Sequence, residues 1–382
     1  MGITREKLVD LLLLVTFAVF TLGQLPGILL KIHPIDIFIF FILIFTIRKR
    51  EFMLTSKKLL PLLMTILVSG FVGITLGVFD LPGPLYLLRL LVYLYLIYLL
   101  PNRLGNRKEL IRDALLTSAF FVAVYGWVQY FLFPNLTSMK LFGWDDHYYR
   151  LTSTFLDPAF TGIIFVFGAL IVLYKYTLKK SRVTLLLILF FLVSLGFTYS
   201  RSSILAFFAG LFVLLFPKYK KLFIVFCTVM AFIVISLPTY KGGEGVKLTR
   251  ISSIAQKLEN YQESIQIISY SPLFGVGYNN VCSVKRVFFK ESGASNSCPG
   301  LDNSFLFIGA TLGVIGLMVF AKFFHDIYRG AAKNTWGSLW KASVVALFVH
   351  SIFTNTLFYS WVLFWLVMLT AISRKTTLHN EA

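Results

Sequence analysis

Four arginines interrupt or border the hydrophobic runs of this chain, where charge is costly. Arg201 separates two such runs, Arg89 lies inside another, and Arg150 and Arg250 lie in polar stretches between them. A guanidinium group binds two phosphate oxygens at once, so arginines gathered in one place would form a site for a phosphate-bearing anion. For Arg201 alone, the alternative is a side chain that extends from the membrane interface to lipid headgroups.

Short polar side chains accompany these charges. Ser200 and Ser202 flank Arg201, and Asp302 and Asn303 precede a long apolar run. A carboxylate can accept the proton of a hydroxyl group or orient that group, which makes Asp302 a candidate catalytic residue and its short polar neighbours candidate supporting residues. The alternative is helix capping, because Asp, Asn and Ser all favour the N-cap position.

The cysteines and histidines carry less information. Three cysteines are too few for a disulfide framework, but Cys282 and Cys298 share one polar stretch. Outside the cytoplasm they would form a disulfide, and otherwise they are two free thiols. The histidines and cysteines show no metal-ligand spacing, so the sequence predicts no metal site.

The composition excludes an ordinary soluble protein. The 382 residues are 57% hydrophobic and only 14% charged, whereas about 25% of residues are charged in soluble domains. Apolar runs of about 20 residues recur, which predicts membrane-spanning helices, and the alternation typical of barrel strands is missing. The net charge of +19 lies in short clusters between apolar runs. Such clusters mark membrane topology and argue against nucleic-acid binding.

These runs predict an all-α, polytopic membrane protein that forms a single membrane domain, residues 1–382, with about twelve spans. Alternate connections, together with both termini, hold most of the 36 lysines and arginines. Because cytoplasmic loops are enriched in these residues, we expect both termini in the cytoplasm. The twelve candidate spans lie near 8–24, 34–48, 59–78, 84–101, 110–133, 159–177, 183–199, 202–217, 220–238, 303–324, 336–354 and 356–373.

Two polar segments are then expected outside the membrane. They cover residues 134–158 and the large loop 239–302. Within the second, apolar residues recur at helical spacing over 252–270, which predicts an amphipathic helix along the outer membrane surface. Arg201 and Asp302 fall on the same outer side, so we expect the site on the outer face.

Four short motifs in this order resemble the O-antigen ligase and O-antigen polymerase superfamily. They are an arginine before a Thr-Phe and proline stretch at 150–158, Ser-Arg-Ser at 200–202, an amphipathic stretch leading to PLFGVGYNN at 272–280, and DNSFL with following glycines at 302–316. The resemblance covers about residues 145–325. It implies a type C glycosyltransferase-like bundle of many helices with a large external loop.

The resemblance also implies an activity. Such an enzyme works in surface polysaccharide biosynthesis, in the cytoplasmic (inner) membrane. It moves a glycan from a polyprenyl-diphosphate carrier to a sugar hydroxyl, either on a lipid core or on another glycan chain, without a cofactor. By this resemblance, the diphosphate would be bound by Arg89, Arg150, Arg201 and Arg250.

One position departs from the family. Its ligases usually have a histidine, regarded as the group that activates the acceptor, where this chain has Asp302. His147, an external histidine beside Arg150, is the next candidate for that role. The departure keeps a non-catalytic membrane scaffold open as a function.

A transporter such as a polysaccharide flippase is the other alternative. Its charged residues should face a central path that is accessible from both sides, but here they gather on the outer side. No paired broken helices stand in matching halves of the chain. The lipid bilayer is the expected surrounding in every case.

Overall fold

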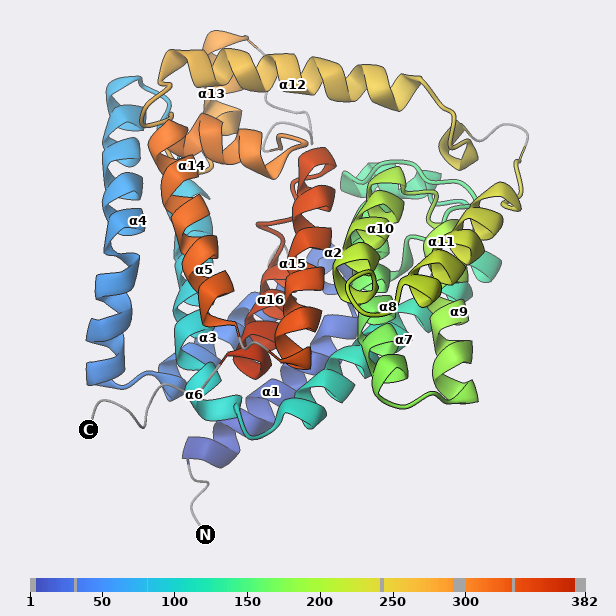
Figure 1. The fold of residues 1–382 in the computed structure, drawn as a ribbon. Coiled ribbons are helices and arrows are strands. Elements are labelled where there is room, and N and C mark those ends of the chain that lie inside the picture. The colour runs from blue at the N-terminus through green and yellow to red at the C-terminus, as the bar shows by residue number, and fades with distance from the viewer. Residues whose placement is uncertain are drawn as a thin grey trace.

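The computed structural model describes residues 5–30, 33–80, 82–240, 244–290, 300–331 and 334–374. These residues form helices, turns and two isolated bridges, and they contain no strand (Figure 1). Among them, five helices are long and apolar enough to cross a membrane, and five shorter helices are also apolar. The architecture is that of a polytopic membrane protein.

Each of the twelve hydrophobic segments predicted from the sequence forms a helix. The five long and five shorter apolar helices include neither α1 nor α11. The number of membrane spans therefore stays a prediction. The twelve helices are α1 (Arg5–Thr21), α3 (Pro34–Thr46), α4 (Lys49–Thr75), α5 (Pro82–Leu99), α7 (Lys108–Leu132), α8 (Pro158–Leu178), α9 (Arg182–Phe197), α10 (Arg201–Leu215), α11 (Lys220–Ile235), α14 (Ser304–Gly330), α15 (Thr335–Phe353) and α16 (Ser360–Ser373).

Shorter elements connect these helices, and one long helix covers them. α12 (Ser252–Tyr270) occupies the segment for which the sequence predicts an amphipathic helix, and it crosses one end of the bundle (Figure 1). Most of its residues are exposed or half-buried. The connecting elements are α2 (Leu25–Leu30), α6 (Pro101–Leu104), α13 (Val281–Phe288) and the 3-10 turns η1 (Thr137–Phe142), η2 (Ser153–Phe155) and η3 (Glu244–Val246).

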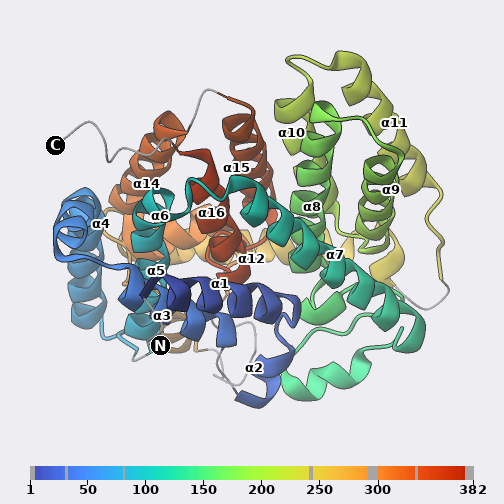
Figure 2. The ribbon, with the colours of Figure 1, turned by 90° about the horizontal axis from the view of Figure 1, so that it is seen from below.

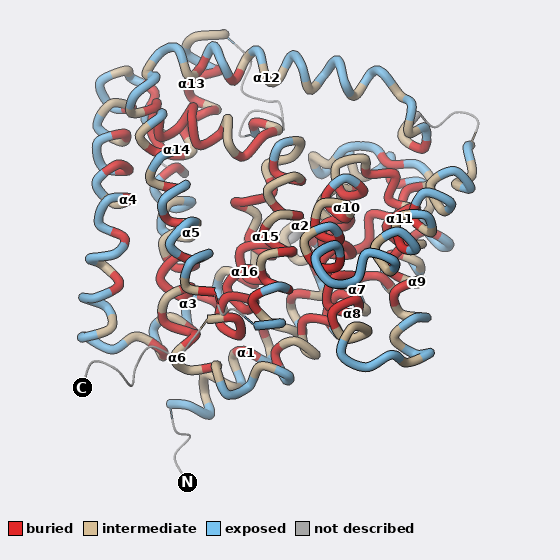
Figure 3. Tube along the Cα trace, in the orientation of Figure 1, coloured by how far each residue is buried: buried red, intermediate tan, exposed pale blue. Residues whose placement is uncertain are grey.

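The most buried helices lie in the middle of the bundle. Every residue of α16 is buried, and α8 is buried over most of its length. α15 and α16 lie between one group formed by α4, α5 and α14 and another formed by α7 to α11, and this arrangement is visible in two views (Figures 1 and 2). The outer helices α4 and α11 are instead largely exposed (Figure 3). A helix that is apolar all round belongs in such a centre, whereas the apolar outer faces suit lipid.

α14 is broken in the middle, at Gly313, where φ is 68° and ψ is −170°. The loop 272–277 fills the break. It donates two backbone hydrogen bonds to α14 carbonyls, at 3.0 and 3.1 Å, and accepts two from α14 amides, at 2.9 and 3.2 Å. Gly275 lies so close to the α14 backbone that a Cβ would overlap it. The glycines of this motif therefore permit a close backbone contact that satisfies the groups freed by the break.

Replacing Gly313 with alanine should cost about 3 kcal/mol or more of stability, because a positive φ strains alanine and its Cβ would overlap the Leu273 carbonyl. Thermal unfolding of the purified protein in detergent measures the loss. Gly77→Ala is the matched control, since Gly77 has a φ of 69° but open space around the added Cβ. An equal loss in both variants would show that the contact between loop and helix contributes nothing.

Candidate functional site

A cavity of about 420 Å³ lies between the start of α10, the start of α12 and the end of α15. Three of the four arginines singled out in the sequence line it, namely Arg150, Arg201 and Arg250. Lys257 from α12 is a fourth cation, and Ser200 and Ser202 line the cavity as well. The fold thus brings together charges that lie up to about a hundred residues apart in the chain.

Arg201 is held in place by its helix and by the chain that enters α12. It is the first residue of α10, and the Ser200 hydroxyl caps this helix by accepting from the Ser203 amide. The cap fixes the first residue of the helix and therefore the position of the Arg201 backbone. The guanidinium donates to the Ser253 hydroxyl at 2.6 Å and to two carbonyls of residues 248–250, at 3.3 and 3.2 Å.

Arg150 and Arg250 are held by main-chain oxygens. Arg150 Nε donates to the Thr198 carbonyl at 3.1 Å, and Arg250 donates to the carbonyls of Gly245 and Lys247 at 2.8 and 3.1 Å. Burial, together with the positive charge of Arg250, lowers the pKa of the Arg150 guanidinium to about 9. The group stays protonated at neutral pH, but a bound anion would stabilise its charge.

Two of the arginines that line this cavity have no acidic partner within ion-pair distance among the described residues. They are Arg150 and Arg201. Buried charge without a counter-charge is costly in a folded protein. The cavity is therefore suited to a ligand that carries several negative charges, such as a diphosphate.

Asp302 is connected to this cavity by an ion pair with Lys257. Its carboxylate pairs with Lys257 Nζ at 3.1 Å, and the same Nζ donates to the Phe353 carbonyl at 2.5 Å. Asn303 caps α14, because its side-chain oxygen accepts hydrogen bonds from two amides of the first turn at 2.8 and 3.1 Å. The Asp302 carboxylate is half-exposed and lies beside the cavity, outside its lining residues. Capping therefore does not account for Asp302.

Arg89 is not brought to the cavity. Its guanidinium lies 3.8 Å from the Asp36 carboxylate and 4.6 Å from the centre of the Tyr86 ring, and it donates to the Phe358 carbonyl at 3.4 Å. Its charge is balanced by an acid from α3. The expectation that it shares a diphosphate site with the other arginines is therefore not supported by its position.

A buried histidine contacts the serine hydroxyls that follow Arg201. His350 of α15 is fully buried, and its Nε2 lies 3.0 Å from the Ser203 hydroxyl and 3.2 Å from that of Ser202. Its Nδ1 lies 2.6 Å from the Thr356 hydroxyl. Sequence reasoning missed this residue, since a lone histidine in an apolar run shows no partner. It missed Lys257 for a similar reason, because one lysine on a polar helix is unremarkable.

Two further residues singled out in the sequence, His147 and Cys282, lie within the described part of the chain. His147 is buried, and burial followed by the nearby Arg150 charge lowers its pKa to about 4. Its Nε2 has no hydrogen-bond partner among the described residues. Cys282 is disulfide-bonded, but Cys298 lies outside the described residues, so the pairing of these two cysteines stays a prediction.

Comparison with known families finds a match to part of the chain. The sequence model of the O-antigen ligase family matches residues 185–321, from within α9 to within α14. The matched region contains Arg201, Arg250, Lys257 and Asp302, whereas Arg150 lies before it. No curated protein matches the chain. Residues 185–321, about a third of the chain, are thus similar to the O-antigen ligase family, which supports a relation of this protein to the O-antigen ligase superfamily.

Proposed function

We propose that this protein is a membrane glycosyltransferase of surface polysaccharide biosynthesis. It moves a glycan from a polyprenyl-diphosphate carrier to a sugar hydroxyl, as an O-antigen ligase or polymerase would. The observation that carries the proposal is the convergence of Arg150, Arg201 and Arg250 on one cavity, with main-chain oxygens as their partners. Such preplaced guanidinium groups stabilise the negative charge that develops on a diphosphate leaving group.

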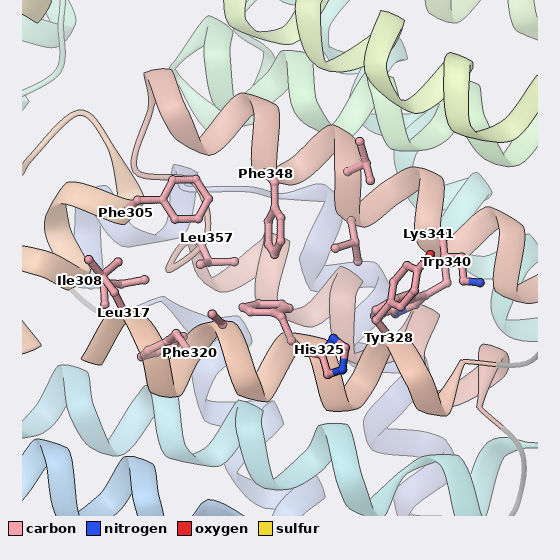
Figure 4. Close-up of a pocket in the computed structure, with 14 residues that line it drawn as sticks. Phe305, Ile308, Leu317, Phe320, His325, Tyr328, Trp340, Lys341, Phe348 and Leu357 are labelled. Carbon is pink, nitrogen blue, oxygen red and sulfur yellow. The ribbon is translucent and has the colours of Figure 1, made fainter. Parts of the chain in front are cut away.

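An apolar groove with one end near Asp302 supports a lipid-linked donor. It has a volume of about 490 Å³ and lies between α14 and α15. Figure 4 shows side chains of both helices on its two sides, with Phe348 of α15 pointing toward α14. Phe305 lies at one end of the groove, in the first turn of α14 and just after Asp302. A polyprenyl chain in the groove would place its diphosphate end near Lys257.

The transfer itself needs few groups from the protein. The acceptor oxygen forms a bond to the anomeric carbon of the donor sugar, and the bond from that carbon to the phosphate oxygen breaks. The electron pair of the broken bond stays on the diphosphate, where Arg150, Arg201 and Arg250 stabilise it. The proton of the acceptor hydroxyl passes to the Asp302 carboxylate. Lys257 joins the two halves of the site, because it lines the cavity and pairs with Asp302.

The proposal includes an orientation in the cytoplasmic membrane. With twelve spans, both termini lie in the cytoplasm, and α12 and the arginine cavity lie on the outer face. The enrichment of lysine and arginine in alternate connections supports this arrangement. In the bundle, α1 begins on the side away from α12 (Figure 1).

Labelling from outside intact cells should distinguish the two ends of the bundle. In a background without reactive native cysteines, Ser269→Cys on α12 should react with an impermeant thiol reagent, and Ser338→Cys at the start of α15 should not. Both serines are exposed, so side-chain burial does not decide the result. Strong labelling at position 338 from outside would contradict the orientation.

A turnover assay tests the activity. The purified protein in liposomes is given a polyprenyl-diphosphate glycan and a sugar acceptor, and the product is measured by mass spectrometry. A glycosyltransferase consumes the donor and releases polyprenyl diphosphate. A flippase relocates the donor between leaflets without consuming it, and a scaffold does neither. Either of the last two results would overturn the proposal.

A further inference from the structure

A second basic pocket, of about 370 Å³, lies between α4, α5, α14 and the end of α16, away from α12 (Figure 1). Four cations line it. Lys57 and Lys58 come from α4, Lys322 comes from α14, and Arg374 directly follows α16. None of these residues belongs to the arginine cavity.

Two of these cations meet on one aromatic ring. Lys58 Nζ lies 5.4 Å from the centre of the Tyr98 ring, and the Arg374 guanidinium lies 5.2 Å from it. Gly330 makes room for the guanidinium, since a Cβ there would come within 3.0 Å of Arg374 Nε and Nη2. The ring attracts each cation, but it does not neutralise their charge.

Positive charge is in excess in this pocket. Asp326 is the acidic side chain in its lining, against four cations. Among the residues that the structure describes, none of the four cations forms an ion pair. Burial lowers the pKa of the Arg374 guanidinium, which indicates a cation removed from water. An anion in the pocket would compensate this charge.

The rest of the pocket is apolar, which limits the kind of anion. α4 and α14 are both long and apolar enough to cross a membrane. Lys58 lies where the apolar run of α4 begins and Lys322 where that of α14 ends, which places the pocket at the depth of lipid headgroups. A phosphate flanked by hydrocarbon is the chemistry of a glycerophospholipid. The apolar lining consists of Leu59, Pro61, Leu62, Val319 and Phe323.

We propose that this pocket binds the phosphate group of an anionic glycerophospholipid. Arg374, Lys58 and Lys322 contact the phosphate oxygens, and the apolar wall contacts the glycerol and the first carbons of the acyl chains. The lipid links α4, α14 and the end of α16, which are far apart in the sequence. This site is independent of the proposed glycosyl transfer.

Native mass spectrometry of the delipidated full chain tests the site. Titration with phosphatidylglycerol should give a saturable complex, and phosphatidylcholine of the same chain length should bind at least about tenfold more weakly. The double variant Lys58→Gln, Lys322→Gln should lose about tenfold or more in affinity for phosphatidylglycerol. The matched control Lys179→Gln, Lys180→Gln removes two exposed lysines from the turn between α8 and α9 and should bind like the wild type.

A competition experiment distinguishes a lipid from a free phosphate compound as the ligand. Glycerol phosphate shares the phosphate group but lacks acyl chains, and it should not compete at concentrations that saturate the lipid site. Equal binding of glycerol phosphate would overturn the lipid as the ligand. Wild-type affinity in the Lys58, Lys322 variant would overturn the pocket as the site. Thermal unfolding of both double variants without lipid should match the wild type, so a loss of affinity reports the site and not the fold.

Discussion

Arg201→Ala should reduce glycosyl transfer by about 10²–10³-fold while the protein stays folded. Arg201 lines the cavity and reaches across from α10 to the chain that enters α12. Its loss removes a donor from the place where the leaving diphosphate gains charge. Rates measured with saturating and limiting donor separate the loss in kcat from any loss in donor binding. Arg250→Ala should have an effect of similar size.

Two comparisons sharpen this result. Arg201→Lys should recover only part of the rate, because an ammonium group cannot bind two phosphate oxygens at fixed geometry. Arg182→Ala is the matched control, since Arg182 begins α9 as Arg201 begins α10, but its side chain is exposed and outside the cavity. If folded Arg201→Ala and Arg250→Ala proteins both transfer glycan at normal rates, the anion site has been misplaced.

Asp302→Asn should abolish transfer, with a loss of about 10²–10⁴-fold, and leave donor binding largely unchanged. Asparagine keeps the size of the side chain and an oxygen that accepts from Lys257, but it takes up no proton. The cap of α14 comes from Asn303 and is not altered. The turnover assay therefore reports the chemistry of position 302 and not the start of the helix.

The pH dependence gives an independent readout of the same residue. An acid limb between pH 6 and 7 would indicate a histidine base, and His147, with its pKa near 4, stays neutral there. The wild-type rate should therefore show no acid limb between pH 6 and 7. Asp302→His should keep some activity and acquire such a limb near the ordinary histidine pKa of about 6.5. Near-normal transfer by a stable Asp302→Asn protein would remove Asp302 from catalysis and make His147 the next residue to substitute.

The helices were predictable from the sequence, because the property that forms them is local. A run of apolar residues long enough for a bilayer must satisfy its backbone internally, and each of the twelve runs forms a helix. The spacing over 252–270 likewise matches α12. Local signals of this kind say which segments form helices, although α4 begins ten residues before the predicted segment 59–78. They do not say which helices touch.

Contacts between distant residues were decided only by the tertiary structure. Arg89 and Arg201 look alike in the sequence, yet packing places one beside Asp36 of α3 and the other at an arginine cavity. Lys257 gains its acidic partner from Asp302, just before α14, and His350 gains a hydroxyl partner from α10. The sequence alone shows that a charged side chain in so apolar a chain needs a polar or charged partner. Which partner it finds depends on the packing of the helices, because that partner lies on another helix.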